Sequence, residues 1–266
     1  MATATGHLNP LPPPRTVGIL GSSVHLVDTV YVTTRIAHWI EARGPAPCQL
    51  VVSGFHGLWL AHKDPGLRSM LQGAELWVPD GIAPVWVARL RGHRNVHRVP
   101  GAELMKAFFA LADEKGYRSY FYGDTAETLK QLSARLVIEY PRHQIAGACS
   151  PPFRAVTPDE DERLVREINQ AQPDVLWVGL GMPRQERWIF EHRERLRVPV
   201  VVGVGAAFGF LSGRVKRCPE WLGASGFEWA FRFLMEPKKL WRRDLLDGPQ
   251  FLLHVALELC GLRQYD

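Results

Sequence analysis

The sequence predicts an α/β protein in which helices cover both faces of a mostly parallel sheet. Its strand-like runs are continuously apolar rather than alternating, as expected for parallel strands that are buried on both faces. They recur roughly every 25 residues, with segments of helical period between them, as in β–α units. Beyond residue 213 no further strand-like run is found. The predicted fold is therefore Rossmann-like, with a helical segment added at the C-terminal end.

Each predicted strand is a short run rich in Val, Ile, Leu or aromatic residues, and most end in glycine. The runs are 16–21, 48–54, 75–81, 119–124, 144–149, 174–181 and 199–205. The predicted helices are segments with an apolar stripe at helical spacing, such as Tyr31, Ile36 and Ile40 in the first. They are 28–42, one beginning near 82, 101–115, 125–139, 158–171 and 183–196.

Three segments are predicted along the chain. Residues 1–14 read as a disordered tail, because prolines deny it a hydrogen-bond ladder and its apolar content is low. Residues 15–213 form the α/β core. Residues 214–266 form a basic helical appendage: between 214 and 246, eight Lys and Arg stand against four Asp and Glu, with many aromatic residues between them. This pattern is typical of a membrane surface or anionic-ligand contact, and equally of helices that pack their aromatic residues on the sheet.

Composition excludes several classes of protein. The chain has 266 residues, a net charge of +5 and a hydrophobic fraction of 46%, enough for one large domain. No run reaches about 18 uncharged apolar residues, so a spanning helix is not predicted, and a proline cluster replaces the apolar core of a signal peptide. The four cysteines are scattered, with neither zinc-site nor disulfide-scaffold spacing. A cytosolic protein is predicted.

A ligand site is expected beyond the carboxyl ends of the strands, where open parallel sheets bind their ligands. Glycines there let a ligand approach the backbone, and the following helices offer free N–H groups to phosphate. Neither GxGxxG nor GxxxxGK[ST] is present, so a classical dinucleotide or P-loop site is not predicted. The candidate ligand-binding residues at these ends are Ser53, Gly123, Gly179, Gly181 and Gly203.

Three further residues are candidates from the same pattern. Asp80, between Pro79 and Gly81, is placed to take a proton from a sugar hydroxyl or to bind a ribose hydroxyl, or else to cap the helix beginning near 82. Arg98 is placed to clamp a phosphate, or to lie on the surface before a turn. Gln185 is placed to hydrogen-bond a base or sugar, or to cap the helix in whose first turn it lies. The histidines form no metal-binding pattern and GxSxG is absent, so neither a metal site nor a Ser-His-Asp set is predicted.

The strand-end segments, in their order along the chain, resemble the WecG/TagA/CpsF family of bacterial glycosyltransferases. The segments VPDGIAPVWVARLRG (78–92), HRVPGAELM (97–105) and PDVLWVGLGMPRQERWI (173–189) carry the resemblance. It continues through YFYGDTAETLKQLSARL (120–136) and the long segment from Gly203 to Arg243, and it spans about residues 16–246.

The resemblance implies an activity. Members move an N-acetylmannosamine-type or related sugar from a UDP donor to a polyprenyl-diphosphate-linked sugar, with inversion and without an obligatory metal, in cell-envelope or capsular polysaccharide synthesis. It implies that Asp80 is the base, that Arg98 binds the donor diphosphate and that Gln185 lies at the nucleotide-sugar pocket. It also implies that the basic residues of the appendage face the diphosphates as part of the catalytic set; these are Arg232, Lys239 and Arg242.

Three departures from the family pattern bear on specificity. After the second strand the family usually has Thr-x-Asn, where this chain has Ser53-Gly54-Phe55, and Phe55 cannot replace an amide. The usual Ala-Ala-Phe-Asp ends here in Gly209, which loses a carboxylate. Lys239 replaces an arginine and loses its planar fork. These differences predict a changed sugar specificity, with loss of activity as the alternative.

The expected partners are a UDP-sugar, a polyprenyl-diphosphate-linked glycan and an anionic membrane surface, with a homo-oligomer possible and no nucleic acid. No cofactor is expected. The expected location is the cytoplasm, peripheral on the inner face of the cell membrane. Two other classes stay open: a catalytically silent module that binds a polyprenyl-phosphate lipid, and an NAD(P)-dependent oxidoreductase.

Overall fold

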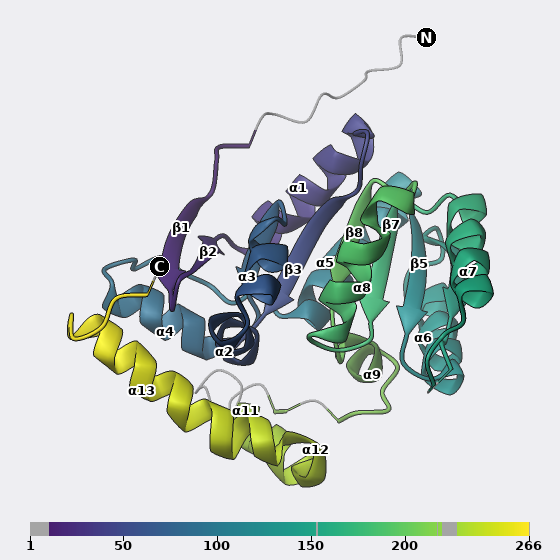
Figure 1. The fold of residues 1–266 in the computed structure, drawn as a ribbon. Helices are drawn as coiled ribbons and strands as arrows, with labels where there is room; N and C mark the ends of the chain where they lie inside the picture. Colours follow the sequence, from purple (N-terminus) through teal and green to yellow (C-terminus); the bar gives the residue numbers. More distant parts are fainter. Residues whose placement is uncertain (1–10, 153, 217, 220–227, 266) are drawn as a thin grey trace.

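A six-stranded parallel sheet forms the centre of the molecule in the computed structural model, which describes residues 11–152, 154–216, 218–219 and 228–265, without the side chains of Glu228 and Lys239. The strand order is β4-β3-β8-β7-β5-β6 (Figure 1). The strands are β3 (Cys48–Ser53), β4 (Leu76–Pro79), β5 (Arg118–Gly123), β6 (Gln144–Cys149), β7 (Val175–Gly179) and β8 (Val200–Gly203). The predicted parallel α/β fold is confirmed.

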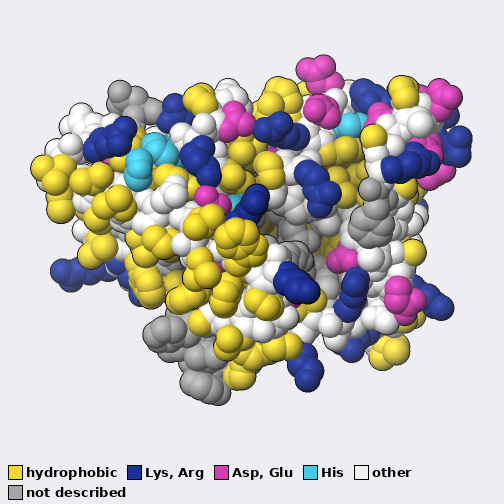
Figure 2. Space-filling view, turned by 60° about the horizontal axis from the view of Figure 1, so that its bottom comes forward, with side chains coloured by type: hydrophobic (Ala, Val, Ile, Leu, Met, Phe, Trp, Pro, Cys, Tyr) yellow, Lys and Arg dark blue, Asp and Glu magenta, His cyan; other side chains and the backbone are white. Residues whose placement is uncertain are grey.

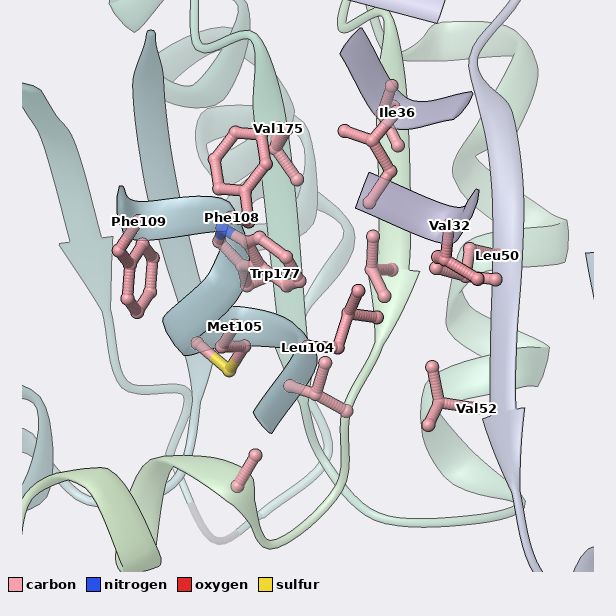
Figure 3. Packing of buried hydrophobic residues seen from close by; sticks show 14 of the residues in the cluster. Val32, Ile36, Leu50, Val52, Leu104, Met105, Phe108, Phe109, Val175 and Trp177 are labelled. Atoms are coloured by element: carbon pink, nitrogen blue, oxygen red, sulfur yellow. The ribbon is translucent and has the colours of Figure 1, made fainter. Parts of the chain in front are cut away.

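Helices cover both faces of this sheet. On one face lie α1 (Thr29–Ala42), α5 (Gly101–Lys115), α6 (Ala126–Glu139) and α9 (Ala207–Leu211). The other face carries α2 (Phe55–Lys63), α3 (Pro65–Gln72), α4 (Ile82–Leu90), α7 (Pro158–Ala171) and α8 (Arg184–His192), which a short 3₁₀ turn (Arg193–Arg195) follows. On the first face, Phe108 and Phe109 of α5 pack edge-on against Trp177 of β7 (Figure 3). These rings are fully buried, so the sheet is a rigid base for whatever lies at its edges.

Side-chain caps set where several helices begin. Asp28 accepts a hydrogen bond from the N–H of Tyr31 and starts α1. Thr125 does the same for α6, and Thr157 forms a capping box with Glu160 at the start of α7. These groups satisfy N–H donors that a helix leaves unpaired in its first turn. α5 has no such residue at its own N-cap, Pro100.

The first predicted strand is not part of the parallel sheet. Strand β1 (Arg15–Ile19) pairs antiparallel with β2 (Ser22–Leu26) in a separate two-stranded sheet. The reason is the turn between them: Leu20 and Gly21 both have positive φ, 49° and 77°, the combination that reverses the chain within two residues. Leucine is an unusual residue for this turn, so the sequence pattern did not reveal it.

The C-terminal helices lie below the carboxyl ends of the strands in Figure 1. They are α11 (Glu228–Met235), α12 (Pro237–Trp241), a π-helical segment (Arg242–Asp247) and α13 (Gly248–Leu259). Phe251 and Val255 of α13 are buried in the core beside α2 and the β1–β2 hairpin. The helical character predicted for this segment is present, but α13 is part of the packed core. Among the described helices none has the length and apolar character needed to cross a membrane.

The predicted disordered tail, 1–14, falls mostly on residues 1–10, which lie outside the described part of the chain. Residues 11–14 have no regular secondary structure. Two of their carbonyl groups contact α1: the Pro12 carbonyl accepts a hydrogen bond from the Tyr31 hydroxyl, and the Leu11 carbonyl accepts one from Arg35.

Candidate active site

Asp80 lies at the carboxyl end of β4, at the start of α5. Its Oδ1 accepts a hydrogen bond from the N–H of Gly101, 3.2 Å away, and its own N–H donates to the Ser53 carbonyl at 3.1 Å. The carboxylate therefore supplies the acceptor that Pro100 cannot give to α5. The alternative role, capping the helix that begins at Ile82, is wrong, because the N-cap of α4 is Gly81 and has no side-chain bond.

Ser53 joins Asp80 to the loop that follows β7. Its Oγ lies 3.6 Å from the sulfur of Met182 and is nearly buried. A Cβ on Gly57, in α2, would lie 1.9 Å from Ser53 Oγ and 2.5 Å from Met182 Sδ, so only glycine allows this approach. The loop after β7 thus reaches past β8 to the end of β3, beside Asp80.

The side chain of Gln185 forms hydrogen bonds to other groups of the protein. Its Oε1 accepts hydrogen bonds from the N–H of Gly181 at 3.1 Å and of Gly205 at 3.0 Å, and its side chain is buried. Its Nε2 donates to Oε1 of Glu186 at 2.8 Å. In this structure the amide joins the loops after β7 and β8.

Glu186 is a buried carboxyl group behind these loops. Burial raises its pKa to about 7, against the lowering effect of the hydrogen bond from Gln185. Its second oxygen has no hydrogen-bond partner in the described part of the chain. Burial and the unpartnered oxygen both favour the protonated form of this carboxyl group.

The predicted glycines divide into two groups. Gly123 and Gly179 bring two strand ends together, since a Cβ on Gly123 would lie 2.5 Å from the Gly179 carbonyl carbon. Gly203 makes room for Gln185, whose Nε2 lies 2.7 Å from the Cβ position. Gly181 differs from these three, because no atom lies within 4 Å of its Cβ position. Of the four, Gly181 is the one that leaves open space for a ligand.

The predicted basic residues lie in the segment before α5 and on the C-terminal helices. Arg98 is half-buried in the segment before α5, next to Val99, whose N–H bonds to the carbonyl of Pro79. The guanidinium of Arg232 lies 5.2 Å from the ring centroid of Phe210 in α9. Arg242 is exposed and stacks on Trp241. The prediction for Lys239 concerns a side chain outside the described part of the chain.

Phe55, one of the departures from the family pattern, has a structural role. Its ring lies 5.7 Å from that of Phe251, centroid to centroid, and it also contacts Gly248. Asp247 nearby accepts hydrogen bonds from Trp59 and Lys63 of α2. These contacts hold the C-terminal helices against α2, which directly follows β3 and the candidate site.

Side chains that could hold a metal ion do not cluster in the described part of the chain. In the described residues no group of three or more His, Cys, Asp or Glu side chains is arranged to hold a metal ion. The Asp159-Glu160-Asp161 sequence lies in the first turn of α7, where Asp161 pairs with Arg195 and His192. A surface hollow of about 350 Å³ lies elsewhere, beside the β1–β2 hairpin, where His25 and Trp77 line it.

A parallel sheet with a carboxylate and glycine-rich loops at its carboxyl edge is typical of α/β proteins that bind nucleotide or sugar ligands beyond the strand ends. The chain belongs to a family of that class, the glycosyl transferase WecG/TagA/CpsF family, which it matches over residues 17–265.

Several curated relatives carry the name N-acetylglucosaminyldiphosphoundecaprenol N-acetyl-beta-D-mannosaminyltransferase. A protein of that name from Bacillus subtilis is 32% identical over 199 residues, 74% of this chain and 75% of the relative. The Bacillus spizizenii protein is 32% identical over 237 residues, 89% of this chain and 85% of the relative. A Staphylococcus aureus protein is 29% identical over 187 residues, covering 70% and 71% of the two chains.

Proposed function

We propose that this protein transfers an N-acetylmannosamine-type or related sugar from a UDP donor to a polyprenyl-diphosphate-linked acceptor, with inversion at the anomeric carbon. The observation that supports the proposal most strongly is the position of Asp80. The family motif carries this carboxylate, and hydrogen bonds hold it at the strand edge beside Ser53 and the loop after β7. The names of the relatives agree with this donor sugar and acceptor.

In the proposed reaction Asp80 takes the proton of the acceptor hydroxyl as its oxygen attacks the anomeric carbon. The bond from that carbon to the UDP oxygen breaks on the opposite face, which inverts the centre. The fixed hydrogen bond from Gly101 holds the carboxylate in one orientation, so little reorganisation is needed when the acceptor arrives.

The departing UDP gains negative charge, which has to be stabilised. Arg98, Arg232, Lys239 and Arg242 would supply the positive charge by their residue type. We propose that these groups do the work that a divalent cation does in other glycosyltransferases, so that transfer needs no metal.

A polyprenyl-linked acceptor is anchored in a membrane. The described C-terminal helices have an exposed apolar surface that could contact one. Figure 2 shows hydrophobic side chains gathered on the left half of this side of the molecule, with Lys and Arg at several points around them. The exposed large apolar residues of these helices include Trp229, Leu234, Met235, Trp241, Leu245, Leu246, Leu252 and Leu253. We propose that this face rests on an anionic membrane.

A panel of UDP-sugars tests the function directly. The purified protein is mixed with each sugar and with a lipid-linked N-acetylglucosamine diphosphate, with and without EDTA. Transfer from UDP-N-acetylmannosamine or a related sugar, unchanged by EDTA, supports the proposal. UDP-sugar binding without transfer to the acceptor would favour the silent-module alternative, and nicotinamide cofactor binding would favour an oxidoreductase.

A further inference from the structure

Asp124 carries a carboxylate at the same carboxyl-terminal edge of the sheet as Asp80, but several strands away. It follows β5, four strands from β4 in the sheet order, which is about 19 Å at the usual ~4.8 Å strand spacing. If the sugar is transferred beside Asp80, the rest of a nucleotide donor has to extend along the carboxyl edge. Its nucleoside end then lies toward β7 and β5.

Several contacts hold Asp124 in an unusual backbone conformation. Its φ is +54°, a left-handed value that a residue other than glycine seldom adopts. Its N–H donates to the Gly179 carbonyl at 3.2 Å, and its own carbonyl accepts from the Ser150 hydroxyl at 2.7 Å. The backbone is thus tied to both neighbouring strands, β7 and β6, in the conformation that directs its side chain.

Among the described residues, one carboxylate oxygen of Asp124 carries the hydrogen bonds. Oδ1 accepts hydrogen bonds from the N–H of Thr125 at 2.7 Å and from Arg214 at 3.4 Å. Oδ2 has no donor within the described residues, and the side chain is 21% exposed. Opposite it stands Gly209, whose Cβ position is 4.0 Å from Oδ2. Gly209 is also where this chain lacks an expected carboxylate, so Asp124 places one within reach of that position.

The chemistry around Oδ2 selects the kind of group that can bind. A phosphate would be repelled by the carboxylate, and a cation would meet Arg214, which also donates to the hydroxyls of Thr125 and Thr128. A neutral donor such as a hydroxyl suits an unoccupied carboxylate oxygen, and an acidic residue at a strand end binds ribose hydroxyls in other doubly wound folds.

On the basis of the proposed function, we propose that Asp124 is a specificity-determining residue that binds a ribose hydroxyl of the UDP donor through Oδ2. The side chain of Arg214 holds the other oxygen of this carboxylate and is 54% exposed, so its positive charge is available to a phosphate next to that ribose.

Calorimetric titration of the full-length protein with UDP, 2′-deoxy-UDP and 3′-deoxy-UDP tests this inference. Asp124→Asn keeps a residue type that tolerates positive φ, and Asp124→Gly removes the side chain without backbone strain. We expect both variants to bind UDP about 10-fold more weakly or worse, because a hydrogen bond to a charged group is lost. One deoxy analogue should bind the wild type and both variants alike, as expected when both partners of one contact are removed. Asp159→Asn, on an exposed helix start, is the control and should match the wild type.

Two results would overturn the inference. If Asp124→Gly weakens UDP and both deoxy analogues equally, or leaves UDP binding unchanged, then Asp124 does not bind ribose, and the proposed function still stands. If the wild type binds none of these nucleotides while folded, as judged by its thermal transition, both the inference and the UDP donor are wrong.

Discussion

The side-chain oxygen of Gln185 accepts a hydrogen bond from the backbone N–H of Gly205 at 3.0 Å, and so joins the loop after β7 to the loop after β8. The same oxygen accepts from Gly181. One buried amide therefore sets the shape of two of the loops at the sheet edge. This makes Gln185 a positioning residue, although its sequence motif first suggests direct contact with a ligand.

Replacing Gln185 with alanine should destabilise the protein by about 2 kcal/mol or more, because two partly buried N–H groups lose their acceptor. UDP affinity should fall with it, since the loops are no longer held together. Thermal unfolding and UDP titration measure the two effects. Gln131→Ala on the exposed face of α6 is the control, and a Gln185→Ala variant as stable as this control would contradict the positioning role.

Glu186 predicts a pH dependence of stability. Because burial raises the pKa of this carboxyl to about 7 in the folded protein, the unfolded chain loses its proton first as pH rises from about 4. The folded state then holds more protons, so this group's contribution to stability falls between about pH 4 and pH 7 and levels off above that.

Glu186→Gln cannot ionise and keeps an acceptor for Gln185. Its stability relative to the wild type should therefore rise between pH 4.5 and pH 7.5, by at most roughly 3 kcal/mol. Urea unfolding at both pH values measures this difference, with the exposed Glu114→Gln as the control. A difference that is the same at both pH values would show that Glu186 is ionised in the fold.

Membrane contact is tested with point variants, because truncation at residue 214 would remove Phe251 and Val255 from the core. The double variant Leu245→Gln with Leu252→Gln removes two leucines that are more than half exposed. We expect its binding to anionic vesicles to fall about 10-fold or more, at the usual value for leucine burial. Val137→Gln with Ile138→Gln, on exposed positions of α6, should bind like the wild type. Equal sedimentation of both double variants would reject this surface.

The sequence predicted most of the fold, because buried parallel strands have a distinctive apolar pattern. The helices 101–115 and 158–171 and the strand 144–149 have the predicted bounds. The helices α2 and α3 were not predicted, since both are short and follow one another closely between β3 and β4. Strand β2 was missed because its turn contains Leu20 in a conformation that side chains rarely adopt.

The candidate site was predicted less completely than the fold. The rule that ligands bind at strand ends led to Asp80 and Ser53, which the structure places together. Met182 and Asp124 were not predicted as site residues, although each directly follows a predicted glycine, Gly181 or Gly123. What distinguishes them is a long-range contact: Met182 reaches Ser53 across the end of β8, and Asp124 lies against Gly209. Such pairings depend on the order of strands in the sheet, which a single sequence does not state.

The most direct test of the account is the rate of sugar transfer by Asp80→Asn. Asparagine keeps an oxygen that can accept the hydrogen bond from Gly101, so the variant should fold and bind UDP like the wild type. It cannot serve as the base, so transfer should fall about 100-fold or more. Transfer at the wild-type rate by a folded, UDP-binding variant would contradict the central claim that Asp80 takes the proton of the acceptor.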